Sequence, residues 1–421
     1  MDILVVGGGG REHAIIWSLS RSPKAGKIYC APGNAGIAQL AECVPIGVFE
    51  FDKLTAFAKE KSIDYVVIGP DDPLAAGIVD AFEAHHIPVF GPRKNAAEIE
   101  GSKTFMKDLL HKYSIPTAAY EKFSDYEAAL SYLRGQGLPV VIKADGLAAG
   151  KGVTVAYSRE EAELALRDIM VTKVFGEAGA QVVIEEFLAG QEMSILAFVD
   201  GETVRPMVAA QDHKPVFDGD KGPNTGGMGT YSPLPHIDEA IIQEAVETII
   251  KPTARAMVAE GRPFSGVLFA GLMISPDGKP KTIEFNARFG DPETQVVLPR
   301  LKSDLLEIFL AVTEGRLAEA EIEWSEEAAV CVVLASEGYP GPYPKGVPIA
   351  GLENCSNDLV FHAGTERTEE GTWVTNGGRV LGVVGMGASI AEARSAAYAS
   401  VAKISFPGMH SRSDIAMKAL I

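Results

Sequence analysis

Residues 140–156 read VVIKADGLAAGKGVTVA, two apolar runs separated by a glycine-rich segment. Both runs are rich in β-branched residues, so the sequence predicts a β-hairpin whose long tip spans residues 145–152. Glycine lets backbone N–H groups approach a ligand closely, and Lys143 and Lys151 add positive charge. This combination suits a polyphosphate, although a surface hairpin with two solvated lysines explains the same residues.

Two common phosphate-binding motifs do not fit this chain. A Walker A motif needs four residues between its first glycine and the Gly-Lys pair, but only three separate Gly146 from Gly150. Its lysine precedes Ser or Thr, whereas Lys151 precedes glycine. Residues 7–13, GGGGREH, nearly match the dinucleotide fingerprint, but Glu12 replaces the third glycine. The sequence therefore argues against a nicotinamide-dependent oxidoreductase.

The composition narrows the class of protein. The 421 residues are 47% hydrophobic and suffice for about three domains. A net charge of −18 argues against a non-specific nucleic-acid binder, which needs a basic face. The four cysteines form no C-x-x-C pair, so neither a zinc site nor a disulfide framework is expected. Without a leader pattern or a long apolar run, we expect a cytoplasmic protein that does not contact a membrane.

The chain alternates between strand and helix patterns, which predicts an α/β fold. Residues 1–101 predict a doubly wound parallel sheet with strands at 3–6, 27–31, 64–70 and 88–91. One amphipathic helix is expected over residues 100–116, and a small α/β unit over residues 118–190. Farther along, strands are expected at 193–199, 203–210, 265–274 and 281–287, and helices at 238–260 and 302–315. Residues 323–330 read as a surface link to a strand-rich C-terminal part, in which Asn376-Gly377 predicts a hairpin and residues 389–404 a helix.

Residues 281–295, KTIEFNARFGDPETQ, alternate apolar and polar side chains. A period of two places Glu284, Asn286 and Arg288 on one face of a strand. The apolar residues, Ile283 among them, are then expected to face a core. A carboxylate and an amide oxygen suit Mg²⁺, which takes few hard oxygen ligands from protein, and a guanidinium can hold phosphate oxygens bidentately. An ordinary half-exposed strand would leave the rigid acidic turn GDPE that follows unexplained.

Two other segments carry candidate binding residues. Residues 211–233 contain five glycines and three prolines without periodicity, which predicts a substrate loop rather than a linker. Residues 182–196 end a buried strand with acidic residues; exposed acids are the default interpretation, but Glu192 could accept ribose hydroxyls. No histidine spacing suggests a metal site and no nucleophilic dyad stands out, so catalysis is expected to be electrostatic.

Nine segments together resemble the phosphoribosylamine–glycine ligase family of the ATP-grasp superfamily, in order and over nearly the whole chain. They read GGGGREHA, APGNAG, GPDDPL, GSKTFMK, KADGLAAGKGV, EEFLAGQEMS, QDHK…GPNTGGMG, IEFNARFGDPETQ and VLASEGYPGPYPKG. The resemblance implies ATP-dependent ligation of glycine to 5-phosphoribosylamine through glycyl phosphate, in purine biosynthesis, by a monomer that uses ATP and Mg²⁺ or Mn²⁺. It also implies a Rossmann-like domain over 1–101, an ATP-grasp domain over 102–325 with a lid over about 118–190, and a β-rich α+β domain over 326–421.

The resemblance further implies roles for individual residues. The set expected to bind ATP is Lys103, Lys143, Gly146, Gly150, Lys151, Gly152, Glu185, Glu186, Phe187, Leu188 and Glu192. Glu284 and Asn286 are expected to hold the metal ion, and Arg288 to stabilise the transferring phosphoryl group. The set expected to bind glycine and the ribosylamine is Gly8, Gly9, Gly10, Asp212, Lys214, Asn224, Gly226, Asp291 and Glu293.

This chain departs from the family pattern in the substrate loop, where the change bears on the site, and near the C-terminus, where it touches packing more than chemistry. Pro215 replaces an arginine of the substrate loop, and Ala416 replaces a glycine near the C-terminus. Three rival interpretations remain: another ATP-grasp ligase or carboxylase, a nucleotide-sensing protein without turnover, and a hydride-transfer enzyme. Dependence on bicarbonate, ATP binding without product, and tight nicotinamide binding would distinguish them in turn.

Overall fold

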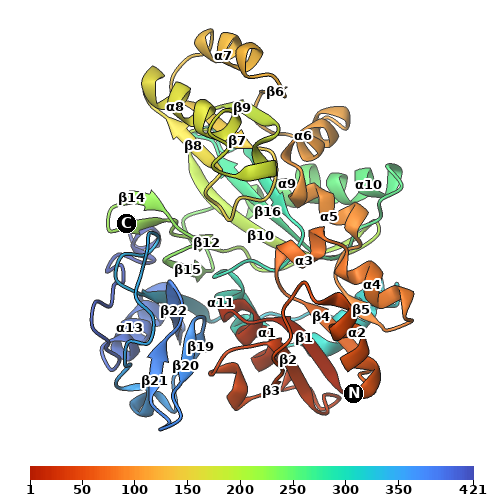
Figure 1. Cartoon of the computed structure of the whole chain (residues 1–421), viewed down its shortest axis with the longest axis vertical. Helices are drawn as coiled ribbons and strands as arrows, with labels where there is room; N and C mark the ends of the chain where they lie inside the picture. The colour runs from red at the N-terminus through yellow and green to blue at the C-terminus, as the bar shows by residue number, and fades with distance from the viewer.

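A five-stranded parallel sheet forms the N-terminal part of the computed structural model, which describes residues 1–421 (Figure 1). Its order is β3-β2-β1-β4-β5, and every pairing is parallel. The strands are β1 (Ile3–Gly7), β2 (Ile28–Pro32), β3 (Glu42–Cys43), β4 (Tyr65–Ile68) and β5 (Val89–Phe90). The helices are α1 (Gly10–Leu19), α2 (Phe51–Glu60), α3 (Asp71–Ala75), α4 (Ile78–Ala84) and α5 (Lys94–Gly101). The predicted doubly wound sheet is confirmed.

The single helix predicted over residues 100–116 is wrong, because the structure divides this stretch into α5 and α6 (Lys103–Lys112). Ser102 between them is extended, with φ −134° and ψ 111°. Its hydroxyl oxygen accepts a hydrogen bond from the Phe105 N–H at 3.1 Å. A serine that satisfies an N–H group of the first turn begins a new helix, and amphipathic periodicity alone does not reveal the break.

A four-stranded antiparallel sheet with the order β11-β10-β16-β17 forms the centre of the molecule. Its strands are β10 (Gln191–Asp200), β11 (Thr203–Pro206), β16 (Ser265–Ile274) and β17 (Pro280–Asn286). The neighbouring helices are α9 (Glu239–Ala245), α10 (Lys251–Ala259) and α12 (Leu305–Thr313), whereas α11 (Thr294–Val297) packs on α1, β15 and β18. A π-helical turn, Val246–Ile250, joins α9 to α10, so the helix predicted over 238–260 is present with one irregular turn.

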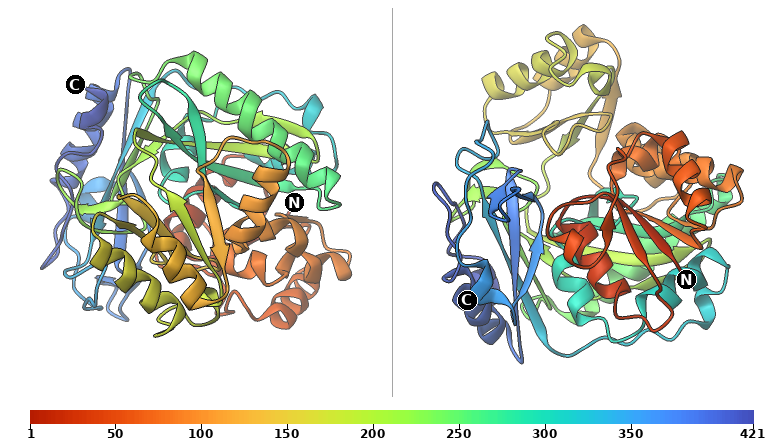
Figure 2. Two further views of the ribbon diagram at one scale, coloured as in Figure 1. Left: turned by 90° about the horizontal axis from the view of Figure 1, so that it is seen from above. Right: turned by 60° about the horizontal axis from the view of Figure 1, so that its bottom comes forward.

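A separate small lid stands above the central sheet (Figures 1 and 2). Its sheet has the order β6-β9-β7-β8 and is covered by two helices. The elements are β6 (Tyr120–Phe123), α7 (Tyr126–Arg134), β7 (Val140–Ala144), β8 (Val153–Ala156), α8 (Arg159–Met170) and β9 (Val182–Glu186). Strands β7 and β8 pair antiparallel, which confirms the predicted hairpin. Thirteen buried residues form a hydrophobic core within the lid itself.

The C-terminal part is built on a five-stranded sheet with the order β12-β15-β18-β22-β19. Its strands are β12 (Gln211–Asp212), β15 (Gly229–Ser232), β18 (Ala328–Ala335), β19 (Leu359–His362) and β22 (Arg379–Gly387). Helix α13 (Ile390–Val401) packs on β18 and β22. The surface link predicted over 323–330 is wrong at its end, because β18 begins at Ala328 and is buried throughout.

The hairpin predicted at Asn376-Gly377 is also wrong. Strand β21 (Trp373–Thr375) pairs with β20 (Thr365–Arg367), whereas β22 lies between β18 and β19. The apolar segment of β22 is buried on both faces, and an interior position in the larger sheet supplies that burial. The two runs flanking Asn-Gly therefore belong to different sheets.

The N-terminal and C-terminal parts meet directly at a pair of buried histidines. The backbone N–H of His362 in β19 donates to Nδ1 of His13 in α1 at 2.7 Å. The Asn34 side chain donates to the carbonyl of His362 at 2.8 Å. None of the helices combines the length and the apolar character that a membrane crossing requires. The proposed domain boundaries remain predictions.

Candidate active site

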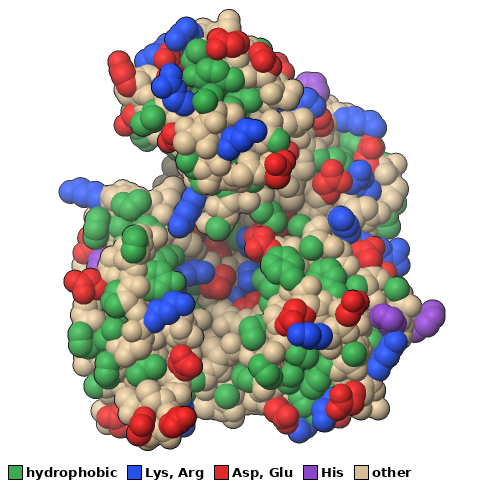
Figure 3. Space-filling model, viewed as in Figure 1, with side chains coloured by type: hydrophobic (Ala, Val, Ile, Leu, Met, Phe, Trp, Pro, Cys, Tyr) green, Lys and Arg blue, Asp and Glu red, His purple; other side chains and the backbone are tan.

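Three adjoining cavities lie where the lid faces the central sheet, and Figure 3 shows acidic and basic side chains gathered in the hollow below the lid. The first, here the lid cavity, measures about 220 Å³ and is lined mainly by β7, β8 and residues 185–188. The loop cavity, about 130 Å³, lies under residues 147–150. The inner cavity, about 310 Å³, reaches the N-terminal and C-terminal parts. Gly150 and Glu284 line all three, which shows that they form one continuous site.

The lid cavity has apolar walls and a charged end. Its apolar lining consists of Val141, Val153, Val155, Phe187, Leu188, Met273 and Ile283. Its charged lining consists of Lys143, Glu185, Glu186, Glu192, Lys214 and Glu284. A slot of this kind can hold a flat aromatic ring between its walls and an anionic tail at its polar end. A nucleotide has both features.

The predicted burial of Ile283 in a core is wrong, because this side chain lines the lid and inner cavities. The register of β16 and β17 shifts here: Gly271 is opposite Glu284, whereas Leu272 is opposite Thr282. Ile283 is therefore the extra residue of a β-bulge, which redirects the side chains on either side of it. Beyond the bulge the alternation holds, and Phe285, Ala287 and Phe289 are buried in the core.

Glu284, Asn286 and Arg288 lie on one face and all line the inner cavity, as the sequence predicts. Burial raises the pKa of Glu284, but the nearby Lys214, Lys143 and Lys103 outweigh it, so the pKa is lowered overall. Glu284 is therefore an anion enclosed by ammonium groups, the arrangement that a bound polyphosphate and a divalent cation would extend.

Arg288 is held from one side by two side chains. Its Nη2 lies 3.0 Å from Glu100 Oε1 and 3.3 Å from Asn286 Oδ1. Its Nε is buried and has no hydrogen-bond partner. Burial raises the pKa of Glu100 to about 7, although Arg288 opposes the rise. A fixed guanidinium that lines a cavity is suited to bind an incoming anion.

The inner cavity brings together most of the residues expected to bind glycine and the ribosylamine. Those lining it are Asp212, Lys214, Gly226, Asp291 and Glu293, whereas Asn224 lines the lid cavity beside it. Glu192, which also lines both cavities, lies 3.3 Å from Lys214 and holds the pKa of that lysine well above its usual value. Acidic and basic groups therefore alternate in this cavity, which suits a zwitterionic or phosphorylated ligand.

Sequence reasoning missed several residues of this site, namely Arg11, Asp71, Glu100, Ser194, Thr225 and Arg379. Arg379 donates to the Gly226 carbonyl at 2.9 Å and to the Asp291 carbonyl at 3.0 Å. Arg11 lies within the quoted segment GGGGREHA, so that segment could have supplied it. No local pattern marks Arg379, which is far from its partners along the chain.

The glycines near the N-terminus do not line the three cavities. The Gly9 N–H already donates to Glu12 Oε2 at 2.8 Å. A Cβ on Gly8 would lie 2.7 Å from the Gly33 carbonyl oxygen, and one on Gly10 would lie 2.7 Å from Gln295 Nε2. Close packing thus accounts for two of these glycines, and the ligand-binding role of all three remains a prediction.

The glycine-rich tip of the lid hairpin faces the strand that carries Glu284. Gly150 and Gly152 line the loop cavity, and Gly150 has φ +74°, a conformation that favours glycine. Lys103 Nζ donates to the Gly146 carbonyl at 3.0 Å, which ties the tip to the start of α6. Lys151 is exposed and lines none of the three cavities, so its role in binding ATP also remains a prediction.

The segment expected to be a loop at residues 211–233 contains a hairpin, β13 (Pro215–Phe217) and β14 (Lys221–Asn224). The C-terminal tail fixes this hairpin. Arg412, only 1% exposed, donates to the Pro215 carbonyl at 3.0 Å and lies 3.0 Å from Asp220. It also pairs bidentately with Asp414, both contacts at 2.8 Å. The tail therefore supports the hairpin whose open end carries Lys214 and Asn224 into the site.

Replacing Arg412 with methionine is expected to destabilise the protein by about 2 kcal/mol, because Asp414 and the Pro215 carbonyl lose charge-assisted hydrogen bonds, while Asp220 keeps its ion pair with Lys418. It is also expected to accelerate tryptic cleavage after the exposed Lys221. Urea unfolding and mass-mapped proteolysis measure the two effects. Arg205→Met is the matched control, since Arg205 donates to carbonyls of Leu317 and Ala320 away from the hairpin. Equal cleavage rates after Lys221 in the two variants would contradict the supporting role.

Replacing Glu293 with glutamine is expected to stabilise the protein increasingly as pH rises from about 5 to 8. Burial raises the pKa of Glu293 to about 8, and Asp212 adds to the rise. An acid with a raised folded pKa loses its contribution to stability as pH rises from its unfolded to its folded pKa. Glutamine cannot ionise, so the variant is expected to gain at least about 1 kcal/mol over this range, the equivalent of one pKa unit.

Chemical unfolding at several pH values, compared with the wild type, measures this gain. The exposed Glu369→Gln, which makes the same chemical change at the surface, serves as the control. A Glu293→Gln difference that is independent of pH would show that the carboxyl ionises normally in the folded protein.

Comparisons with known proteins agree along the whole chain. Three family models match: the phosphoribosylglycinamide synthetase N domain over residues 1–100, its ATP-grasp (A) domain over 101–294 and its C domain over 329–418. A phosphoribosylamine–glycine ligase of Halalkalibacterium halodurans is 54% identical over 421 residues, covering 100% of this chain and 97% of its own length. The crystal structure of the Thermotoga maritima phosphoribosylamine–glycine ligase is 36% identical with a TM-score of 0.86, covering 99% of this chain and 100% of its own. A Campylobacter jejuni biotin carboxylase, 16% identical with a TM-score of 0.73 over 97% of this chain and 92% of its own, shares the fold.

Proposed function

The chain belongs to the phosphoribosylglycinamide synthetase family, and from that membership we infer that the three adjoining cavities are its active site. The protein is an ATP-dependent ligase that joins glycine to 5-phosphoribosylamine, giving glycinamide ribonucleotide in purine biosynthesis. The observation that carries the assignment of the site is the polar face of Glu284, Asn286 and Arg288, which shares cavities with Lys143 and Lys214. That arrangement supplies charge where a triphosphate needs it, without a protein nucleophile.

The nucleotide occupies the lid cavity and points its phosphates into the loop cavity. Its base lies between the apolar walls, next to the backbone of residues 185–188, and Glu192 accepts the ribose hydroxyls. Lys103 and Lys143 hold the phosphates. The tip formed by Gly146, Gly150, Lys151 and Gly152 covers them and keeps water away from the reacting groups.

The family implies a divalent metal ion, and the residues present fit one. Glu284 and Asn286 supply two oxygen donors, and nowhere in the chain do three or more His, Cys, Asp or Glu side chains gather in a way that could hold a metal ion. Two protein ligands completed by phosphate oxygens and water suit Mg²⁺, or Mn²⁺. When bound, the metal ion neutralises the charge of the phosphate oxygens. The choice between the two ions remains a prediction, as do a monomeric state and a cytoplasmic location.

The chain's own residues act by binding and by charge neutralisation. The inner cavity holds glycine and the ribosylamine among Asp212, Lys214, Gly226, Asp291 and Glu293, with Asn224 contributing from the adjoining lid cavity. An oxygen of the glycine carboxylate attacks the γ-phosphorus, ADP leaves, and Arg288 stabilises the negative charge of the transferring phosphoryl group. The amine nitrogen then attacks the carbonyl carbon of the glycyl phosphate, phosphate leaves and an amide forms. Both steps require proximity and a dry cavity rather than a covalent enzyme intermediate.

A coupled ADP-release assay in which each substrate is omitted in turn tests the proposal. ADP is expected only when ATP, the metal ion, glycine and freshly generated 5-phosphoribosylamine are all present. Bicarbonate-dependent release would favour a carboxylase, and ATP binding without release under any mixture would favour a nucleotide sensor. Glycinamide ribonucleotide, identified by mass, is the product expected.

A further inference from the structure

One buried amine adjoins the nucleotide site without lining any of its three cavities. Lys107 of α6 is fully buried, and its Nζ donates to Thr117 Oγ1 at 2.7 Å and to the Ala118 carbonyl at 3.3 Å. Both acceptors belong to the short segment that joins α6 to the first lid strand. Lys107 Nζ also lies 3.4 Å from Oε2 of Glu185 in β9. Burying an unpaired ammonium group costs free energy, so a lysine in this position is expected to have an acidic partner and a functional role.

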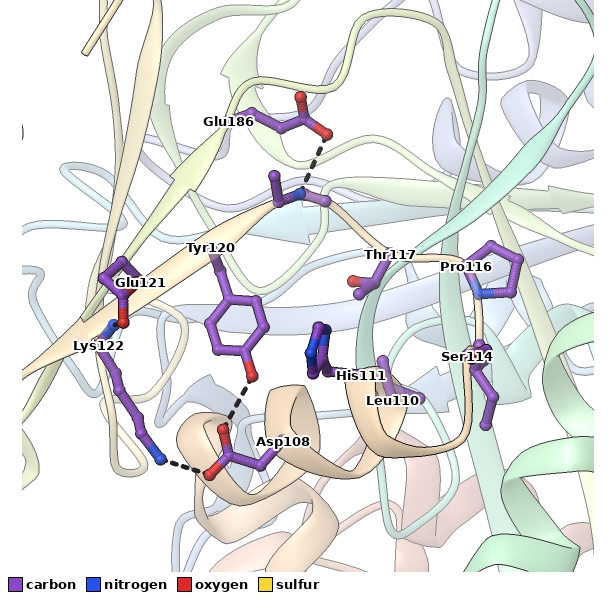
Figure 4. A pocket seen from close by; sticks show the side chains of 13 residues that line it. Asp108, Leu110, His111, Ser114, Pro116, Thr117, Tyr120, Glu121, Lys122 and Glu186 are labelled. Carbon is purple, nitrogen blue, oxygen red and sulfur yellow. Dashed lines mark hydrogen bonds and ion pairs between the residues drawn. The ribbon is translucent and has the colours of Figure 1, made fainter.

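The ring of Tyr120 lies beside this amine. Lys107 Nζ lies 5.5 Å from the ring centroid. Tyr120 also lines an open groove, which Figure 4 shows from close by. In this groove the Tyr120 hydroxyl points to Asp108 and donates a hydrogen bond to its Oδ1 at 2.8 Å. Across the groove Glu186 accepts the Ala119 N–H at 3.0 Å (Figure 4). Lys107 is therefore fully buried at the base of the lid.

Two lysines share the single carboxylate of Glu185. Lys143 Nζ lies 3.1 Å from Glu185 Oε1, the oxygen that Lys107 does not approach. Oε1 has no hydrogen-bond partner although it is buried, so the Lys143 ammonium group is close to it but not aligned with it. Lys143 instead donates to the Ile283 carbonyl at 3.3 Å, at the wall of the lid cavity. Counted by themselves, the two ammonium groups and the one carboxylate of this cluster carry a net charge of +1.

We propose that Lys107 is a positioning residue for the nucleotide: it holds Glu185 toward the base of the lid and so leaves the Lys143 ammonium group free for the triphosphate. The inference rests on the proposed function, because it takes the lid cavity as the ATP site. With Lys107 present, the three side chains carry one more positive charge than they do without it, and that charge favours an anionic ligand. Without it, Glu185 and Lys143 form a closed neutral pair, and the cavity loses much of its attraction for phosphate.

The pairing predicts a diagnostic set of variants. Lys107→Met is expected to weaken ATP binding about tenfold and adenosine binding by less than about twofold, because only ATP carries the anionic tail. Lys107→Met/Glu185→Gln removes both charges, restores the net charge of +1 of the cluster and is expected to bind ATP more tightly than Lys107→Met does. Lys112→Met on the same helix, whose lysine pairs with Glu260 at the surface, is the control and is expected to bind normally.

Isothermal titration of each full-length variant with ATP and Mg²⁺ measures these affinities, and circular dichroism checks the fold. ATP binding by Lys107→Met equal to that of Lys112→Met would overturn the inference. A loss that Glu185→Gln does not relieve would overturn it too, since it would mean that Lys107 acts only on the fold. Wild-type protein that releases no ADP with both substrates would overturn the proposed function instead, and leave a pure nucleotide-binding role testable by the same titrations.

The pH dependence of ATP binding tests the proposal on two proteins whose cluster of residues 107, 143 and 185 has the same net charge of +1 at neutral pH, namely the wild type and the double variant. Burial lowers the pKa of Lys107 to about 8, while Glu185 raises it, Lys143 lowers it and Glu186 raises it slightly. The wild type is therefore expected to lose affinity for ATP as pH rises from 7.5 to 9, because Lys107 gives up its proton. The double variant is expected to lose at least about threefold less over that range. Identical profiles for the two proteins would contradict the proposal even if Lys107→Met did not fold.

Discussion

Arg288→Ala is expected to slow ligation by roughly a hundred- to a thousand-fold, the usual effect of removing one fixed donor to a developing negative charge. Affinity for ATP is expected to stay within about threefold of the wild type. The groups proposed to hold base and ribose lie on β9 and β10, whereas Arg288 follows β17 and lines the loop and inner cavities. The variant therefore loses transition-state stabilisation rather than nucleotide binding. Single-turnover ADP release and ATP titration measure the two quantities separately.

Removing Arg288 leaves the buried Glu100 without its ion-pair partner, and this side effect requires a separate control. Glu100 is buried against the guanidinium, and its carboxylate could disturb the site once that group is gone. Its pKa of about 7 means that it can take up a proton instead. Arg288→Ala/Glu100→Gln removes the stranded acid and is expected to remain as slow as Arg288→Ala alone. Near-normal turnover in Arg288→Ala, or recovery in the double variant, would show that Arg288 does not stabilise the transferring phosphoryl group.

The parts of the site that the sequence predicted are those set by local periodicity. Alternation along β17 placed Glu284, Asn286 and Arg288 on one face, because successive side chains of a strand point to opposite sides. The lid hairpin followed from two β-branched runs around a glycine-rich tip, and the parallel sheet from strands that alternate with helical patterns. In each case the signal lies within a few residues of the feature that it predicts.

The parts that the sequence could not predict depend on contacts between distant segments. Arg379 reaches the site only because β22 lies beside β18, and the Asn-Gly signal before it pointed to a different pairing. The bulge at Ile283 depends on the register between β16 and β17, which no single strand reveals. Glu100 pairs with Arg288 near the end of α5, and amphipathic periodicity did not reveal that Ser102 separates α5 from α6. Residue patterns therefore predict which side chains share a face of a strand, whereas the contacts that those side chains make with distant segments depend on the assembled fold.

Glu284→Gln is expected to raise the concentration of Mg²⁺ needed for half-maximal ligation at least a hundred-fold. Glutamine keeps the shape of the side chain but loses the one formal charge that the proposed protein ligands offer, and outer partners of a metal alone contribute 10- to 100-fold. The same change removes a carboxylate from among Lys103, Lys143 and Lys214. Binding of ATP without metal is therefore expected to hold or improve, because fewer negative charges face the phosphates. Titrating Mg²⁺ in the ligation assay measures the first effect, and titrating ATP in the absence of metal measures the second.

Asn286→Asp is the complementary variant, because it adds a carboxylate at the neighbouring proposed ligand. It is expected to lower the Mg²⁺ requirement and to weaken metal-free ATP binding, the reverse of Glu284→Gln in both assays. A merely structural role for Glu284 would weaken both kinds of binding together, since a distorted strand would misplace the phosphate-binding lysines as well. An unchanged metal titration in Glu284→Gln would remove this carboxylate from the metal site. In that case Asn286, phosphate oxygens and water would hold the metal ion.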